Sequence, residues 1–117
     1  MIKIFAVFFL VFTVFFHLAA DEHWFAEKIS KTLVTRQGRT VDAGRALKGK
    51  KVAVYFSASW CGPCRAFTPK LVNFYNAVAK KKTLEIVFVS SDRNEKAMKQ
   101  YMRHASMPWL ADRKAHV

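Results

Sequence analysis

The clearest hydrophobic pattern in this chain is a pair of short apolar runs separated by a helical pattern. The runs are Lys51–Ser57 and residues 84–89, and both are rich in β-branched and aromatic residues. Short, nearly continuous apolar runs are typical of strands that are covered on both faces of a sheet. Residues 61–80 lie between them and carry apolar side chains at helical spacing, which predicts a buried stripe of Leu71, Phe74, Tyr75 and Val78. This order predicts a βαβ unit with parallel strands and a right-handed crossover.

Weaker patterns precede this unit. Residues 32–35 and 39–41 predict a small hairpin, because Gly38 between them can adopt a positive φ. Residues 43–47 predict one turn of helix that ends at Gly49.

A further helix is predicted after the second apolar run. Asp92 and Glu95 have the spacing of an N-cap residue and its capping partner. The apolar face of this helix consists of Met98, Tyr101, Met102 and Ala105, and we expect the helix to end within residues 106–110. The pattern then provides two central strands and one small hairpin.

The first 20 residues have the features of a secretory signal peptide. Lys3 is followed by an apolar run over residues 4–16, and small residues occupy positions 19 and 20. The run is shorter than the ~20 residues that a spanning helix needs, and an uncleaved signal anchor is the alternative. We therefore expect residues 21–117 to form one domain in the secretory pathway, either secreted or in the ER lumen, where disulfide chemistry is permitted.

The formal net charge of +12 predicts a strongly basic surface. Such a surface attracts acidic proteins, anionic lipids and nucleic acids without specificity. Because no nucleic-acid motif accompanies the charge, we interpret it as a solvated basic face and expect no specific nucleic-acid partner. Membrane contact is expected only if the leader is uncleaved, or if the chain acts as a cationic peptide. Two cysteines and four scattered histidines lack the ligand spacing of a zinc site, so no metal is expected.

The two cysteines, Cys61 and Cys64, lie two residues apart where the first apolar run meets the predicted helix. Unpaired N–H groups and the helix dipole favour a thiolate at a helix N-terminus, so we expect the pKa of Cys61 to be lowered. Pro63 fits the first helical turn, and Gly62 lets a partner approach the backbone closely. These features predict thiol–disulfide exchange. A permanent disulfide without turnover is the alternative.

Four segments together resemble the nucleoredoxin and tryparedoxin branch of the thioredoxin superfamily. They are residues 54–61, 64–69, 87–92 and 107–111. The resemblance implies a thioredoxin-like fold with three α/β/α layers and a redox-active disulfide between Cys61, the nucleophile, and Cys64, the resolving thiol. It implies that Trp60 shields this pair and that Trp60, Gly62 and Pro63 are the residues that support the active site. It also implies protein or small-peptide disulfides as substrates and an external thiol reductant, without a dissociable cofactor.

The chain departs from this family in three positions or segments. Gly62 stands where this branch more often has proline. Tyr55 stands where thioredoxins proper carry a buried carboxylate, so a proton relay must come from water or another group. The resembled proteins are usually cytosolic or nuclear, whereas this chain begins with the predicted leader.

The resemblance also implies that the family fold continues beyond this chain. The family adds a strand preceded by a cis-proline, a last strand and a last helix, and Pro108 is not that proline. We therefore expect a fold truncated after the second helix of the core, with Lys51–Ser57 as an exposed edge. A sheet-completing partner or self-association would cover that edge. The alternative function is an inactive or binding-only fragment of a longer nucleoredoxin-like protein.

Overall fold

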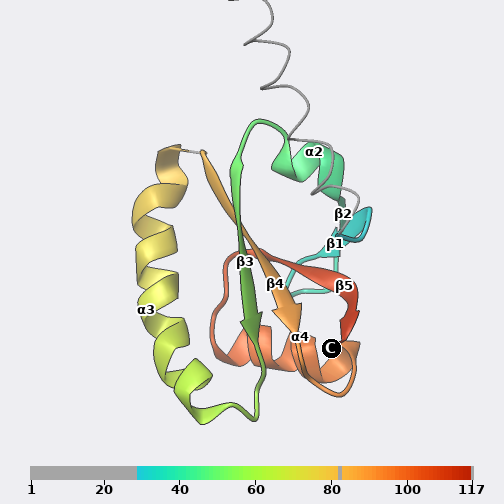
Figure 1. Cartoon of the computed structure of the whole chain (residues 1–117), viewed down its shortest axis with the longest axis vertical. Coiled ribbons are helices and arrows are strands. Elements are labelled where there is room, and N and C mark those ends of the chain that lie inside the picture. Colours follow the sequence, from blue (N-terminus) through green and yellow to red (C-terminus); the bar gives the residue numbers. More distant parts are fainter. Residues whose placement is uncertain (1–28, 82, 117) are drawn as a thin grey trace, which may run out of the picture.

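A computed structural model of the chain describes residues 29–81 and 83–116 (Figure 1). The predicted leader, residues 1–20, lies outside the described residues. A five-stranded sheet of order β2-β1-β5-β4-β3 forms the centre of the fold. The strands are β1 Thr32–Val34, β2 Thr40–Asp42, β3 Lys51–Ser57, β4 Leu84–Ser90 and β5 Leu110–His116. The helices are α2 Ala43–Leu47, α3 Gly62–Val78, the 3-10 helix η1 Ala79–Lys81 and α4 Glu95–His104.

The predicted βαβ unit and hairpin are both confirmed. Strands β3 and β4 are parallel, and Val54 lies opposite Val87 in their register. Strands β1 and β2 are antiparallel, and Leu33 lies opposite Val41. Between them Gly38 has a φ of 88°, which glycine adopts without the steric cost of a Cβ.

Strand β5 is an element that the hydrophobic pattern did not predict, and the expectation of only two central strands is wrong. It lies between β4, to which it is parallel, and β1, to which it is antiparallel. The strand was missed because its apolar start, Leu110 and Ala111, runs into charged residues. One of these, Asp112, is nevertheless buried, and its carboxylate accepts a 3.0 Å hydrogen bond from the backbone N–H of Ser30.

Helices α3 and α4 both pack against one core cluster on the sheet. The crossovers β3–α3–β4 and β4–α4–β5 step across the sheet in one direction, so right-handed connections place both helices on one side. The core on this side includes Ile86, Phe88, Met98, Tyr101, Met102 and Trp109. A smaller cluster on the other side joins α2 to the sheet through Leu33, Ala43, Leu47 and Val87.

Strand β3 is less covered than its apolar sequence predicted. In the described part of the chain it pairs only with β4 and forms one edge of the sheet. Phe56 on this strand is 65% exposed, so the prediction that both faces are covered is wrong. The predicted buried stripe of α3 is also wrong at Phe74, which is 52% exposed, because that side chain lies beyond the residues that contact the core.

The N-cap of helix α4 lies two residues later than the predicted N-cap, Asp92. Its N-cap is Asn94, whose side-chain oxygen accepts a 2.9 Å hydrogen bond from the N–H of Ala97. Asp92 cannot fill this role because its carboxylate is bound by Ser59 and Ser90. Glu95 pairs with Arg113 instead of closing a capping box. The predicted apolar face is confirmed, since Met98, Tyr101 and Met102 are buried.

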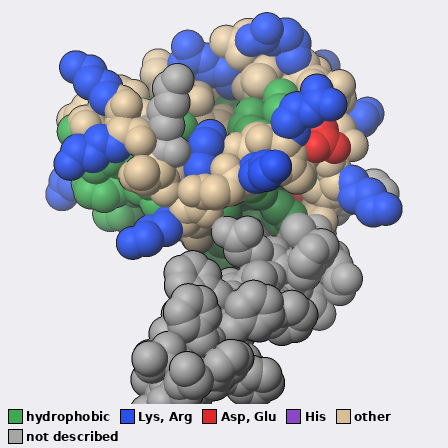
Figure 2. All heavy atoms as spheres, turned by 90° about the horizontal axis from the view of Figure 1, so that it is seen from above, with side chains coloured by type: hydrophobic (Ala, Val, Ile, Leu, Met, Phe, Trp, Pro, Cys, Tyr) green, Lys and Arg blue, Asp and Glu red, His purple; other side chains and the backbone are tan. Residues whose placement is uncertain are grey.

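The acidic side chains of the described residues are all engaged within the fold. Each accepts a hydrogen bond or pairs with a cation, and they are Asp42, Glu85, Asp92, Glu95 and Asp112. Lys and Arg side chains, in contrast, are spread over the face shown in Figure 2. The surface charge available to a partner on this face is therefore predominantly positive.

Candidate active site

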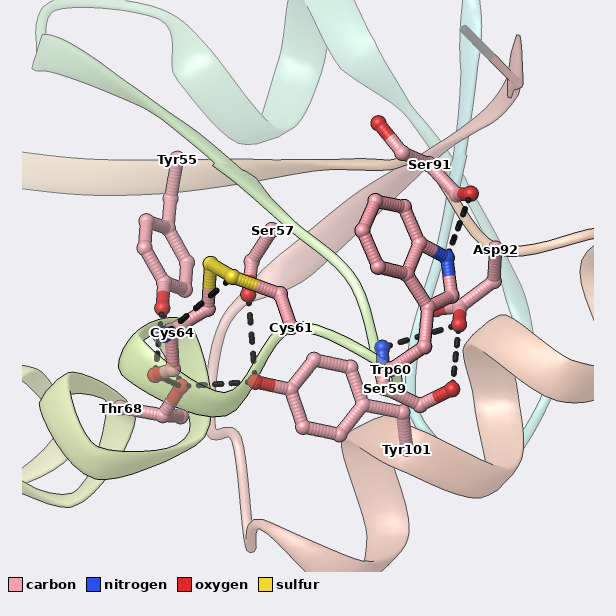
Figure 3. The surroundings of a disulfide bond; sticks show 10 residues. All are labelled: Tyr55, Ser57, Ser59, Trp60, Cys61, Cys64, Thr68, Ser91, Asp92 and Tyr101. Atoms are coloured by element: carbon pink, nitrogen blue, oxygen red, sulfur yellow. Dashed lines mark hydrogen bonds between the residues drawn. A yellow bond between two sulfur atoms is a disulfide. The ribbon is translucent and has the colours of Figure 1, made fainter.

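Cys61 and Cys64 form a disulfide at the junction between β3 and α3 (Figure 3). Their Cα atoms are 5.2 Å apart. Cys61 is the N-cap residue of α3, and its Sγ accepts the backbone N–H of Cys64 at 3.3 Å. The sulfur of Cys61 therefore lies at the positive end of a 17-residue helix, where negative charge is favoured.

The two residues between the cysteines are both exposed. Pro63 lies in the first turn of α3, where its missing N–H leaves no helical bond unmade. A Cβ built on Gly62 would meet no other atom within 4 Å, so packing within the chain does not require glycine there. This segment therefore presents accessible backbone beside the disulfide.

Trp60, next to the first cysteine, combines exposure with a fixed anchor. Its side chain is 72% exposed, and its indole N–H donates a 3.2 Å hydrogen bond to the backbone carbonyl of Ser91. The indole thus joins the cysteine segment to the loop that follows β4.

Asp92 is a site residue whose role the sequence did not reveal. Its carboxylate is buried and accepts hydrogen bonds from the N–H and hydroxyl of Ser59 and from the hydroxyl of Ser90. The carboxylate therefore holds the segment before Trp60 against the end of β4. The available signal was the position of Asp92 directly after a buried strand, which the capping-box spacing obscured.

A cluster of hydroxyl groups lies beneath the cysteines and was also missed. Thr68 Oγ1 donates to the backbone carbonyl of Cys64 at 2.8 Å. The hydroxyls of Tyr55 and Tyr101 each lie 2.9 Å from Thr68 Oγ1, and Ser57 Oγ lies 3.1 Å from the Tyr101 hydroxyl. Figure 3 shows these side chains converging from β3, α3 and α4. Tyr55, the residue that stands where the resemblance implied a carboxylate in thioredoxins proper, is one member of this cluster.

An open pocket of about 490 Å³ lies beside Trp60. Its walls come from the cysteine segment and from the loop and first turn leading into α4. The lining residues are Ser59, Trp60, Ser91, Asp92, Arg93, Asn94 and Ala97. The lining combines an aromatic side chain, serine residues and the exposed residue Arg93.

Two ionisable groups away from the cysteines have shifted pKa values. Burial, followed by the hydrogen bond to Glu85 and its charge, raises the pKa of Tyr75. The hydrogen bond from Arg113, with help from Lys99, lowers the pKa of Glu95 despite the opposing effect of burial. Within residues 29–81 and 83–116, no group of three or more His, Cys, Asp or Glu side chains could hold a metal ion. No helix in these ranges is long and apolar enough to cross a membrane.

Comparison with known proteins agrees with this geometry. Residues 49–115, more than half of the chain, match the thioredoxin-like family. The chain belongs to the thioredoxin-like family. The predicted thioredoxin-like α/β fold is confirmed by this match and by similar solved structures, and the relatives described next confirm the resemblance to nucleoredoxin and tryparedoxin.

Individual relatives support the assignment over part of their length. Probable nucleoredoxin 1 of Arabidopsis thaliana is 51% identical over 79 residues, which cover 68% of this chain and 13% of the relative. Tryparedoxin of Trypanosoma brucei brucei is 50% identical over 66 residues, covering 56% of this chain and 44% of that protein. The crystal structure of thioredoxin from Wuchereria bancrofti has a TM-score of 0.67 and 39% identity, covering 74% of this chain and 60% of that one. The chain therefore spans less than two thirds of these relatives.

Proposed function

We propose that this chain is a thiol–disulfide oxidoreductase of the protein-disulfide reductase type. The observation that carries the proposal is the position of Cys61, whose sulfur caps α3 and accepts the N–H of Cys64. A thiolate at this position is stabilised by the helix dipole and by that N–H. Family membership supports thiol–disulfide chemistry in general.

In the proposed reaction, Cys61 is the nucleophile and Cys64 the resolving thiol. The Cys61 thiolate attacks a substrate disulfide, forms a mixed disulfide and releases one substrate sulfur as a thiolate, which takes up a proton. Cys64 then loses its proton and attacks Cys61 Sγ. The Cys61–Cys64 bond forms and the second substrate thiolate leaves. An external thiol reductant restores the dithiol by the reverse exchange, so no dissociable cofactor is required.

We propose disulfides of proteins or small peptides as the substrates. Exposed Gly62 and Pro63 leave the backbone beside the cysteines open to an extended partner. The basic surface favours encounter with acidic partners, through long-range attraction that salt weakens. In this proposal Trp60 shields the sulfur pair from one side while its indole remains anchored to Ser91.

Reduction of insulin by dithiothreitol tests the activity directly. We expect the full chain to accelerate precipitation of the insulin B chain, and Cys61→Ser to abolish the acceleration. Thr32→Ala, an exposed substitution in β1, is the matched control and should behave as wild type. Equal rates for the wild type and Cys61→Ser would favour the inactive or binding-only alternative.

A second proposed role concerns the open edge of β3. Phe56 on this strand and Phe67 and Phe74 on the adjoining α3 are 65%, 50% and 52% exposed. A seven-residue edge strand with an apolar run over residues 52–56 is a template for pairing with another strand. We propose that a sheet-completing partner or a second copy of the chain pairs here.

Sedimentation equilibrium tests this pairing. If the chain self-associates, its apparent mass should rise with concentration, and Phe56→Lys should keep it monomeric. If a different partner is required, the chain alone should be monomeric and unfold with low stability. A monomer that unfolds cooperatively with the stability of an ordinary domain would contradict both forms of the proposal.

The location of the protein is proposed from the leader alone. We propose entry into the secretory pathway, with residues 1–20 acting as a signal peptide or anchor. N-terminal sequencing of the expressed protein tests this proposal. A chain recovered from the cytosol with Met1 intact would contradict it and would agree with the usual location of the resembled branch.

A further inference from the structure

The hydroxyl cluster beneath the cysteines has one consistent direction of hydrogen bonding. Each hydroxyl has a single proton to donate. Thr68 donates its proton to the Cys64 carbonyl at 2.8 Å, so it must accept from both Tyr55 and Tyr101 at 2.9 Å. The 3.4 Å separation between the Tyr55 hydroxyl and the Cys64 carbonyl makes that acceptor the weaker choice for Tyr55.

The outer end of the cluster follows the same direction. Because Tyr101 donates to Thr68, it accepts the proton of Ser57 at 3.1 Å. The chain of hydrogen bonds thus runs from Ser57, which donates to Tyr101, to Tyr101, which donates to Thr68. Tyr55 also donates to Thr68. All four hydroxyl dipoles lead to one acceptor, the Cys64 carbonyl oxygen.

Burial makes this arrangement strong. Thr68, Ser57 and Tyr101 are 0%, 5% and 6% exposed. In surroundings of low dielectric constant, linked hydrogen bonds polarise and strengthen one another. The loss of one member also leaves the others without a partner, which costs more than the bond itself. The cluster therefore fixes the Cys64 backbone relative to β3 and α4.

The first turns of α3 lack one backbone hydrogen bond, so contacts that fix their path matter more there. Pro69 has no N–H, so the carbonyl of Arg65 lacks the donor that a regular helix would provide four residues later. This gap lies one residue after Cys64. A side-chain hydrogen bond from Thr68 to the carbonyl four residues earlier is itself associated with helix bending. The cluster thus sets the local path of the helix that carries the second sulfur.

Resting on the proposed function, we propose that Thr68, held by Tyr55, Tyr101 and Ser57, is a positioning residue that aligns Cys64 for the resolving step. In that step Cys64 gives its thiol proton to solvent, and its sulfur attacks Cys61 Sγ. The Cys61–Cys64 bond forms while the bond from Cys61 to the substrate sulfur breaks. The departing sulfur takes the electron pair and then a proton from solvent. Cys61 attacks earlier and from the N-cap, where the helix dipole stabilises its thiolate together with the Cys64 N–H, so the first step depends less on this alignment than the second.

A chromogenic disulfide, dithiobis-nitrobenzoate, separates the two steps. The reduced full chain should release one coloured thiolate rapidly as Cys61 attacks, and a second as Cys64 resolves the mixed disulfide. Thr68→Val should slow the second phase by roughly tenfold, the net effect of about one hydrogen bond, and slow the first phase by a clearly smaller factor. Thr68→Ser should restore the second phase because it retains the hydroxyl. Cys64→Ser should release only the first thiolate and so assigns the phases.

Two further variants keep the test decisive. Tyr101→Phe removes one donor to Thr68 and should slow the second phase by a smaller factor, even if Thr68→Val fails to fold. Tyr75→Phe is the matched control, because it removes a tyrosine hydroxyl that binds Glu85 instead of the cluster. The proposal would be overturned if Thr68→Val and Tyr101→Phe both left the second phase unchanged. It would also be overturned if these variants slowed the first and second phases equally. Failure to reduce insulin with both phases intact would instead count against the proposed function alone.

Discussion

The Asp92 carboxylate beyond the end of β4 accepts a 2.9 Å hydrogen bond from the backbone N–H of Ser59, two residues before Cys61. The contact joins residues that are 33 positions apart in the sequence. Because Asp92 also binds the Ser59 and Ser90 hydroxyls, one buried carboxylate connects β4 with the segment carrying Trp60. The conformation of the segment before Cys61 thus depends on a carboxylate outside the cysteine motif.

Asp92→Ala should therefore be strongly destabilising. It leaves the Ser59 N–H and two hydroxyls without their acceptor, and we expect a loss of about 3 kcal/mol in the free energy of unfolding. Urea unfolding followed by Trp fluorescence measures this loss. Asp42→Ala is the control, because it removes only the exposed N-cap of α2 and should cost about 1 kcal/mol. Equal losses in the two variants would show that burial of Asp92 is unimportant.

Tyr75 gives a prediction at high pH. Its pKa is raised, mainly by burial and then by Glu85, so the folded state favours the neutral phenol. Stability from this residue is complete below the ordinary tyrosine pKa of 10.0 and declines as the pH rises above it, because the unfolded chain ionises first. Tyr75→Phe should cost about 1 kcal/mol near neutrality.

Urea unfolding from about pH 8 to about pH 11 tests whether the stability from Tyr75 declines as the pH rises. The stability difference between the wild type and Tyr75→Phe should shrink as the pH rises. Tyr101→Phe provides a comparison, since it removes another buried hydroxyl that has no contact with Glu85. A difference that grows with pH for Tyr75→Phe would contradict the assigned direction.

Glu95 gives a prediction at low pH. Its carboxylate pairs with Arg113 at 3.0 Å and with Lys99 at 3.2 Å, and its pKa is lowered chiefly by Arg113. The resulting stability is present above the ordinary pKa of 4.5 and is lost as the pH falls through the folded-state value. Because both partners are partly exposed, Glu95→Gln should cost less than about 1 kcal/mol at neutral pH.

A double-mutant cycle isolates the pair. Glu95→Gln should have a smaller effect in an Arg113→Gln background, and its effect should fade in acid and in high salt. Thermal unfolding at neutral and acidic pH measures each corner of the cycle. An effect that persists after the carboxyl is protonated would point to packing and not to charge.

The βαβ unit and the cysteine motif were predictable because their signals are local. The apolar runs of β3 and β4 and the spacing of Cys61 and Cys64 are each contained within a few residues. The resemblance extended this prediction to the fold, because its four segments span both strands and the start of β5. The local pattern could not predict which faces of these elements are covered by the rest of the fold, as the exposed side chains of Phe56 and Phe74 show.

The missed features depend on contacts between distant segments. Strand β5 contains buried Asp112, whose carboxylate accepts a hydrogen bond from the N–H of Ser30, 82 positions earlier in the sequence. The spacing of Asp92 predicted an N-cap for the helix that follows it, but its carboxylate instead accepts a hydrogen bond from the N–H of Ser59. The hydroxyl cluster draws on β3, α3 and α4, so no single stretch of sequence contains its signal.

The C-terminal end of α4 departs from the usual residue choice. Ser106 has a φ of 53°, in the left-handed region that glycine occupies most readily. Its N–H donates to the Arg103 carbonyl at 3.1 Å, and the N–H of Met107 donates to the Met102 carbonyl at 2.9 Å. This pair of bonds is the Schellman arrangement, and the side chains of Met102 and Met107 are both fully buried beneath it.

Ser106→Gly should therefore stabilise the protein. The left-handed conformation costs a residue with a Cβ about 1–2 kcal/mol, and part of the gain is offset by the greater freedom of glycine in the unfolded chain. We expect a net increase of about 0.5 to 1 kcal/mol in the free energy of unfolding, measured by urea denaturation. Ser106→Ala is the control and should give no increase, because alanine keeps the Cβ. If both substitutions stabilise equally, relief of the left-handed conformation is not the cause.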